Sequence, residues 1–232
     1  MAMTIGLKER RRMKAGNIKE IVLASKQHIQ HKYNDERDCI RDTKDELDKL
    51  QKQGKILYNS GVREDDANLT KISDKMDELE TQLSDVEDSA DIFRTTLMML
   101  TELCSKIETI YKQELYKFII KCVPKNLPDM IKGDKANLTA VQAVITAANE
   151  KLTAKFMSAL QTDQERAKFK QKFADQKASI KMMYGKSADS NDASEAAKRN
   201  AARFGKKADS EVQGVLPVDI NNNNTNANIN RA

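Results

Sequence analysis

An uninterrupted apolar pattern runs through the middle of the chain, from Leu69 to Tyr111. Apolar residues recur there in alternating steps of three and four, which is a heptad repeat. The apolar positions repeat every 3.5 residues or so, about one tenth of a residue less than the roughly 3.6 residues per turn of a straight helix. The seam therefore stays against a partner helix only if the helices form a left-handed supercoil. The pattern predicts one long helix packed against others. The seam residues are Leu69, Ile72, Met76, Leu79, Leu83, Val86, Ala90, Phe93, Leu97, Leu100, Cys104, Ile107 and Tyr111.

Similar but less regular apolar patterns precede and follow this seam, and turn signals separate the three. Gly61 marks the first turn, and Pro124 and Pro128 interrupt the chain again because proline lacks a backbone donor. Asp66 stands just before the second pattern, where a side chain that accepts a backbone hydrogen bond begins a helix. The predicted helices span residues 16–58, 66–122 and 136–184.

The lengths of these helices and of their connectors predict the fold. Short connectors make consecutive helices antiparallel neighbours. We therefore expect an all-α fold, an elongated antiparallel three-helix coiled-coil bundle over residues 16–185. A basic segment, residues 1–15, precedes the bundle. Residues 186–232 are rich in Ser, Asp and Asn and too poor in apolar residues to offset chain entropy, so we expect a disordered, polar, Asn-rich tail.

The apolar face of the second helix widens after Ile92. A stripe that broad needs more than one neighbouring helix to cover it. In a three-helix bundle part of it is left over, which predicts that a second copy of the chain packs there. The expected oligomer interface consists of Phe93, Leu97, Leu100, Leu103, Ile107, Ile110 and Tyr111.

Composition agrees with a helical protein and favours one kind of compartment. The chain has 8 Gly, 3 Pro and no Trp, and 32% of its residues are charged, which is typical of solvated helices rather than sheets. Its three cysteines are widely spaced and odd in number, so no disulfide framework is expected. With no signal-peptide pattern and no apolar stretch near the roughly 20 residues of a membrane span, we expect a cytoplasmic protein, or one assembled there into a viral or phage particle.

Charge alternates along the chain. Residues 1–60 carry 14 Lys and Arg against 9 Asp and Glu, residues 61–100 carry 4 against 11, and residues 151–200 carry 11 against 6. Either basic helices pack on an acidic one inside a single bundle, or the basic faces bind an anionic membrane or nucleic acid. The candidate residues for an anionic surface are Lys8, Arg10, Arg11, Arg12, Lys14, Lys168 and Lys172.

Signals of catalysis are nearly absent. His28 and His31 are three residues apart on a predicted helix, but no third metal ligand accompanies them. Gly185 and Lys186 resemble the end of a phosphate loop, but that loop needs another glycine at position 180, which is Ile. We therefore expect no catalytic residue, no metal and no cofactor.

The leading hypothesis is a non-enzymatic coiled-coil scaffold that self-associates and recruits other proteins, a class that includes structural components of viral or phage particles. The first alternative is a BAR-like or filament-forming protein that binds or remodels membranes. The second alternative is a nucleic-acid-binding protein that uses the basic clusters at 8–14 and 151–186. The tail residues expected to dock a protein partner are Phe204, Val215, Leu216 and Pro217.

Overall fold

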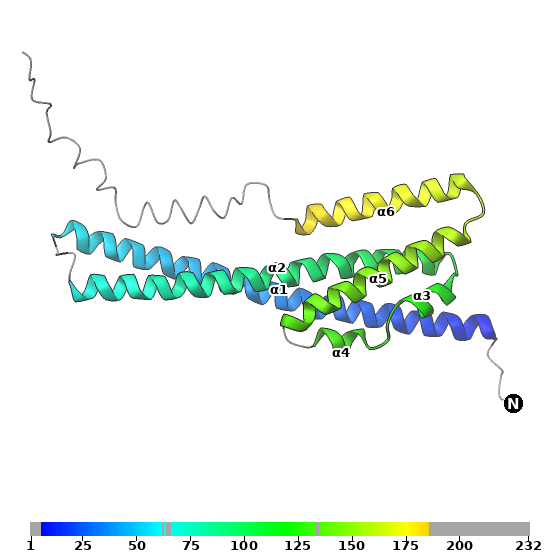
Figure 1. Ribbon diagram of the computed structural model, residues 1–232, viewed down its shortest axis with the longest axis horizontal. Coiled ribbons are helices and arrows are strands. Elements are labelled where there is room, and N and C mark those ends of the chain that lie inside the picture. The colour runs from blue at the N-terminus through cyan, green and yellow to red at the C-terminus, as the bar shows by residue number, and fades with distance from the viewer. Residues whose placement is uncertain (1–5, 62, 64–65, 133–134, 186–232) are drawn as a thin grey trace, which may run out of the picture. The chain divides into compact units, whose positions relative to one another are not determined.

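The computed structural model describes residues 6–61, 63, 66–132 and 135–185, and this part of the chain is helical without any strand (Figure 1). The predicted all-α class is confirmed. The described residues form six helices rather than three. They are α1 (Leu7–Asn59), α2 (Ala67–Lys112), α3 (Tyr116–Cys122), α4 (Leu127–Ile131), α5 (Lys135–Ala159) and α6 (Asp163–Tyr184).

The two longest helices, α1 and α2, form an antiparallel hairpin (Figure 1). Asp66 begins α2 as predicted, since its carboxylate accepts a hydrogen bond of 2.8 Å from the backbone N–H of Asn68. All thirteen positions of the predicted seam are buried or half-buried. Ion pairs join the two helices beside the seam, among them Lys44 with Glu87 at 2.9 Å. The seam is thus the packed face of α2, and its supercoil stays a prediction.

The second helix ends earlier than the sequence predicts, at Lys112 rather than near Cys122. Glu114 has a φ of 57°, a left-handed conformation that costs a non-glycine residue roughly 1–2 kcal/mol and cannot continue a helix. No glycine or proline stands there, so the sequence carries no signal of the break. The following residues form α3 and α4, and α4 has Pro128 in its first turn, where a missing N–H needs no partner.

The segment with α3 and α4 sets the direction of the next helix. The side-chain amide of Gln142 donates to the Ile92 carbonyl at 3.3 Å, and that of Asn149 donates to the Met99 carbonyl at 3.3 Å. Residue numbers rise together along both helices, so α5 runs parallel to α2. The predicted antiparallel packing of the second and third blocks is wrong, because residues 113–132, with α3 and α4, carry the chain back along the hairpin before α5 begins.

The predicted third helix is in fact two helices, α5 and α6. Thr162 and Glu165 form a capping box: the Glu165 N–H donates to the Thr162 hydroxyl at 3.2 Å, and the Thr162 N–H donates to the Glu165 carboxylate at 3.3 Å. The chain then turns back, and Arg94 of α2 donates to the carbonyl of Tyr184 at the end of α6, at 3.4 Å. The signal was present in the sequence as Thr-x-x-Glu, a known helix-start pattern.

The buried apolar residues fall into two clusters. The larger draws on all six helices. The smaller contains Leu47 of α1 and Met76, Leu79 and Leu83 of α2, with no residue from the other helices. We call residues 35–91 the arm, where α1 and α2 extend past the other described helices, and residues 6–34 with 92–185 the body (Figure 1).

Phe156 of α5 is the central contact between α5 and α6. Its side chain is fully buried, and its ring centroid lies 4.9 Å from that of Phe169 and 5.8 Å from that of Phe173. We expect Phe156→Ala to lower the free energy of unfolding by about 3–5 kcal/mol, measured by urea denaturation with far-UV circular dichroism. Met182→Ala is the control, because Met182 is 84% exposed. It should change the free energy by no more than about 0.5 kcal/mol, and equal effects of the two variants would contradict this packing.

Candidate binding surface

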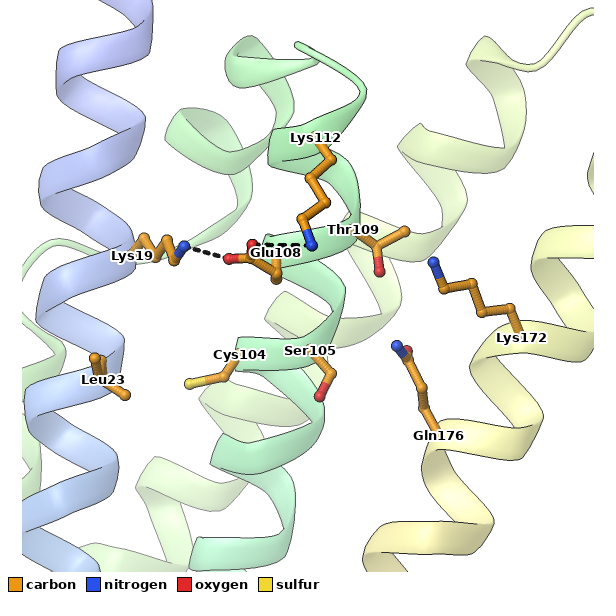
Figure 2. Close-up of a pocket in the computed structure, with 9 residues that line it drawn as sticks. All are labelled: Lys19, Leu23, Cys104, Ser105, Glu108, Thr109, Lys112, Lys172 and Gln176. Atoms are coloured by element: carbon orange, nitrogen blue, oxygen red, sulfur yellow. Dashed lines mark ion pairs between the residues drawn. The ribbon is translucent and has the colours of Figure 1, made fainter.

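A groove of about 380 Å³ opens between α1, α2 and α6 (Figure 2). Its charged groups are mostly cationic, with three lysines and one glutamate. The lining residues are Lys19, Leu23, Cys104, Ser105, Glu108, Thr109, Lys112, Lys172 and Gln176.

Glu108 of α2 holds two of these lysines in place. Its carboxylate pairs with Lys19 from α1 and with Lys112, one turn further along α2, at 3.4 Å (Figure 2). The hydrogen bond from Lys19 lowers the pKa of Glu108, and Lys112 acts in the same direction, while partial burial opposes the shift. The ammonium of Lys19 also lies 5.6 Å from the centroid of the Tyr111 ring. These contacts fasten α1 to α2 at the groove.

The α6 side of the groove presents Lys172 and Gln176 (Figure 2). The ammonium of Lys172 lies 5.8 Å from the Phe169 ring centroid, and no carboxylate of the described residues pairs with it. The Gln176 side-chain oxygen is buried and accepts no hydrogen bond from any described residue. With three lysines and one glutamate, the groove attracts negative charge. Burial raises the pKa of the Cys104 thiol on its lining, so this cysteine is a poor nucleophile.

A buried lysine holds α6 against α2. The Lys106 side chain is 9% exposed, its ammonium pairs with the Glu102 carboxylate at 2.6 Å, and it lies 5.8 Å from the Phe173 ring centroid. A charge taken out of water needs such partners. Sequence reasoning missed Lys106, because its burial depends on Phe173, which reaches it from another helix.

The lysines of α6 itself face solvent. At about 100° per residue they divide between two flanks of the helix. Lys168 and Lys172 share one flank, beside the groove, and the other three share the opposite flank. Within the described residues none of the five joins an ion pair. The exposed lysines are Lys168, Lys170, Lys172, Lys177 and Lys181.

The predicted N-terminal basic cluster forms the first two turns of α1. Two of its residues join ion pairs. Lys8 pairs with Glu114, which follows α2, and Arg12 pairs with Glu9 of the same helix at 3.7 Å. The anion-binding role of the cluster stays a prediction, as does that of Lys168 and Lys172. All five residues of the cluster are exposed, namely Lys8, Arg10, Arg11, Arg12 and Lys14.

The predicted oligomer interface lies inside the single chain. Five of its residues are fully buried, and Phe93 and Tyr111 are half-buried. Helices α1, α3, α5 and α6 pack on α2 and cover this face. The expectation that it is left over for a second copy is corrected, because the chain has more helices in the body than predicted. The five buried residues are Leu97, Leu100, Leu103, Ile107 and Ile110.

The remaining predictions from the sequence concern a metal site, a membrane span and the docking residues of the tail. In the part that the structure describes, no group of three His, Cys, Asp or Glu is placed to hold a metal ion, and His28 and His31 are exposed on α1. None of the helices within the described ranges is long and apolar enough to cross a membrane. The four predicted docking residues of the tail lie outside the described residues. They are Phe204, Val215, Leu216 and Pro217.

Comparison with known proteins adds no relative: no family model, no curated protein and no solved structure matches the chain. The surface chemistry of the described residues is therefore what bears on function.

The Glu108 ion pairs predict a pH-dependent contribution to stability. Because the folded pKa of Glu108 is lowered, its contribution is complete above the unfolded pKa and is lost as pH falls through the folded pKa. Glu108→Gln should therefore lower the free energy of unfolding at neutral pH, by about 0.5 kcal/mol for a partly exposed pair, and change nothing at acid pH below the folded pKa. Urea denaturation of the unmodified chain and of the variant, at neutral and at acid pH, measures this difference in the free energy of unfolding.

The matched control is Glu150→Gln, which removes the same charge from an exposed position of α5 that joins no ion pair within the described residues. It should leave the free energy of unfolding nearly unchanged at neutral pH. An effect of Glu108→Gln that persists unchanged in acid would show that the ion pairs are not its source.

Proposed function

We propose that this chain is a non-enzymatic assembly protein that self-associates and recruits other proteins. The observation that carries the proposal is the separation of charge between body and arm. The body, residues 6–34 and 92–185, has 24 Lys and Arg against 11 Asp and Glu, a net charge of +13. The arm, residues 35–91, has 9 against 18, a net charge of −9.

These two charges cannot neutralise each other within one copy. Long helices are stiff, so they hold the solvated faces of the arm away from those of the body. Complementary surfaces on separate molecules attract one another, speed their encounter and select the orientation in which they meet. A molecule with a strongly acidic part and a strongly basic part is therefore suited to bind other copies of itself or partners of either charge.

Other features support an assembly role over an enzymatic one. In the groove between α1, α2 and α6, Glu108 is engaged in ion pairs with Lys19 and Lys112, and the lining presents no nucleophile beside a base. Cys39, Cys104 and Cys122 are free thiols, which fits the cytoplasmic setting expected from the sequence. The apolar residues of the tail remain the proposed contact for protein partners.

The mass of the full-length chain in solution tests this proposal. At low salt we expect sedimentation equilibrium to give a mass above the 26.2 kDa of one copy, rising with protein concentration. At about 1 M salt, where charges are screened beyond about 3 Å, the mass should fall toward that of one copy. A mass of one copy at every concentration and salt would refute self-association.

A second candidate function is binding to an anionic membrane surface, and one observation favours it. Leu7 is 65% exposed and Met13 is 54% exposed, and both lie among the exposed cations at the start of α1. Apolar side chains mixed with cations on a helix are typical of segments that lie in the membrane interface.

Flotation with anionic liposomes separates this second function from the first. If the start of α1 binds membranes, the protein floats at low salt, is released by salt, and loses flotation when Leu7→Ser and Met13→Ser are combined. Met182→Ser with Met183→Ser is the control, since these residues are 84% and 73% exposed at the end of α6 and should not matter. Absence of flotation at low salt would exclude the membrane function.

A further inference from the structure

The outer flank of α6 carries a basic stripe. Arg166, Lys170, Lys177 and Lys181 fall within about 60° of one another around the helix, at about 100° per residue. Arg166 is half-buried and pairs with Asp163 at 2.7 Å, while the three lysines are exposed and join no ion pair within the described residues. Apart from Arg166, this flank is an unpartnered helix face in the body.

The arm carries an acidic stripe on α2. Asp74, Glu78, Asp85 and Asp88 are all exposed, and they fall within about 80° of one another around the helix. The buried seam occupies the other side of α2, against α1. This stripe therefore points away from the hairpin partner.

The two stripes have nearly the same spacing. Along α6 the charges follow one another in steps of four, seven and four residues, and along α2 in steps of four, seven and three. At about 1.5 Å per residue both stripes are about 21–23 Å long. Two such helices laid antiparallel would thus bring Asp74, Glu78 and Asp85 opposite Lys181, Lys177 and Lys170, with Asp88 at the level of Arg166.

The stripes of one copy cannot meet each other fully. The end of α6, at Tyr184, lies beside Arg94 of α2. Glu78 is sixteen residues further toward the arm tip, or about 24 Å along α2, and Asp74 is further still. Lys177 precedes Tyr184 on a helix that runs antiparallel to α2, so it lies even further from the arm tip. The matching surface must come from another molecule.

We propose that the arm of one copy docks on α6 of a second copy, with the acidic stripe of α2 against the basic stripe of α6. The inference rests on the self-association proposed above and names the surfaces that carry it. Each partner contributes a different surface, so the contact is heterologous. Repeated contacts of this kind close into a ring or continue as a filament.

Charge reversal tests the contact directly. The arm variant combines Asp74→Lys with Glu78→Lys, and the body variant combines Lys177→Glu with Lys181→Glu. Each variant alone should lose the self-association of the unmodified chain at low salt, because like charges then face each other. An equimolar mixture should regain it, because the basic arm of one variant fits the acidic α6 of the other. The control, Lys151→Glu with Lys155→Glu, makes the same charge change at exposed positions of α5, four residues apart and off both stripes, and should retain self-association.

The outcomes separate this inference from the proposed function. If the unmodified chain self-associates and both variants do so equally, the arm–α6 contact is wrong while self-association stands. If the unmodified chain stays a single copy, both fail. If the folded variants lose self-association but their mixture does not regain it, the pairing of these two stripes is overturned. A body variant that keeps self-association but no longer binds anionic vesicles would reassign the α6 stripe to lipid.

A second measurement does not depend on the variants. A carbodiimide joins a carboxylate to a lysine amine with loss of water and bridges only groups in contact. In the unmodified multimer, mass spectrometry should find α2 peptides with Asp74 or Glu78 joined to α6 peptides with Lys177 or Lys181. Finding none of these pairs in the multimer would overturn the proposed contact.

Discussion

The structure depends on burial of the broad apolar face of α2. Leu97, Leu100, Leu103, Ile107 and Ile110 are all fully buried, and no single helix is wide enough to cover them. Helices α1, α3, α5 and α6 each pack against this face. The short return segment follows from the same constraint, since it brings α5 onto α2 in a parallel direction that a tight turn cannot produce. The body is therefore an arrangement of helices around one half of α2.

The same helix also determines where the body ends. Toward the arm tip the apolar face of α2 narrows to a single seam, which α1 alone can cover through Leu47, Met76, Leu79 and Leu83. A two-helix hairpin leaves much of each helix in water, and charged residues occupy those faces. In the arm these residues are twice as often acidic as basic, 18 against 9. The narrowing of one apolar face thus produces both the arm and its exposed charge.

The sequence predicts local features of this fold better than the way its helices meet. The seam and the start of α2 at Asp66 follow from periodicity and capping, which act within one helix. The direction of α5 depends on where residues 113–132 lead the chain, and the break at Glu114 has no glycine or proline to mark it. In the sequence Lys106 does not differ from the solvated lysines of other helices, because its burial depends on Phe173 of α6. For the candidate surface, the basic residues could be named, but which flank of α6 stays in water depends on that packing.

Charge segregation of this degree has an electrostatic cost within each helix. Carboxylates spaced three or four residues apart on one face of α2 repel one another, and each such pair destabilises a helix by a few tenths of a kcal/mol. The lysines on the outer flank of α6 repel in the same way. A bound surface of opposite charge relieves the repulsion on both helices. It leaves the packing of each helix against its own core unchanged. If the arm docks on α6 as proposed, the electrostatics of the two stripes favour the associated state over the isolated chain, most strongly where the stripes match in spacing.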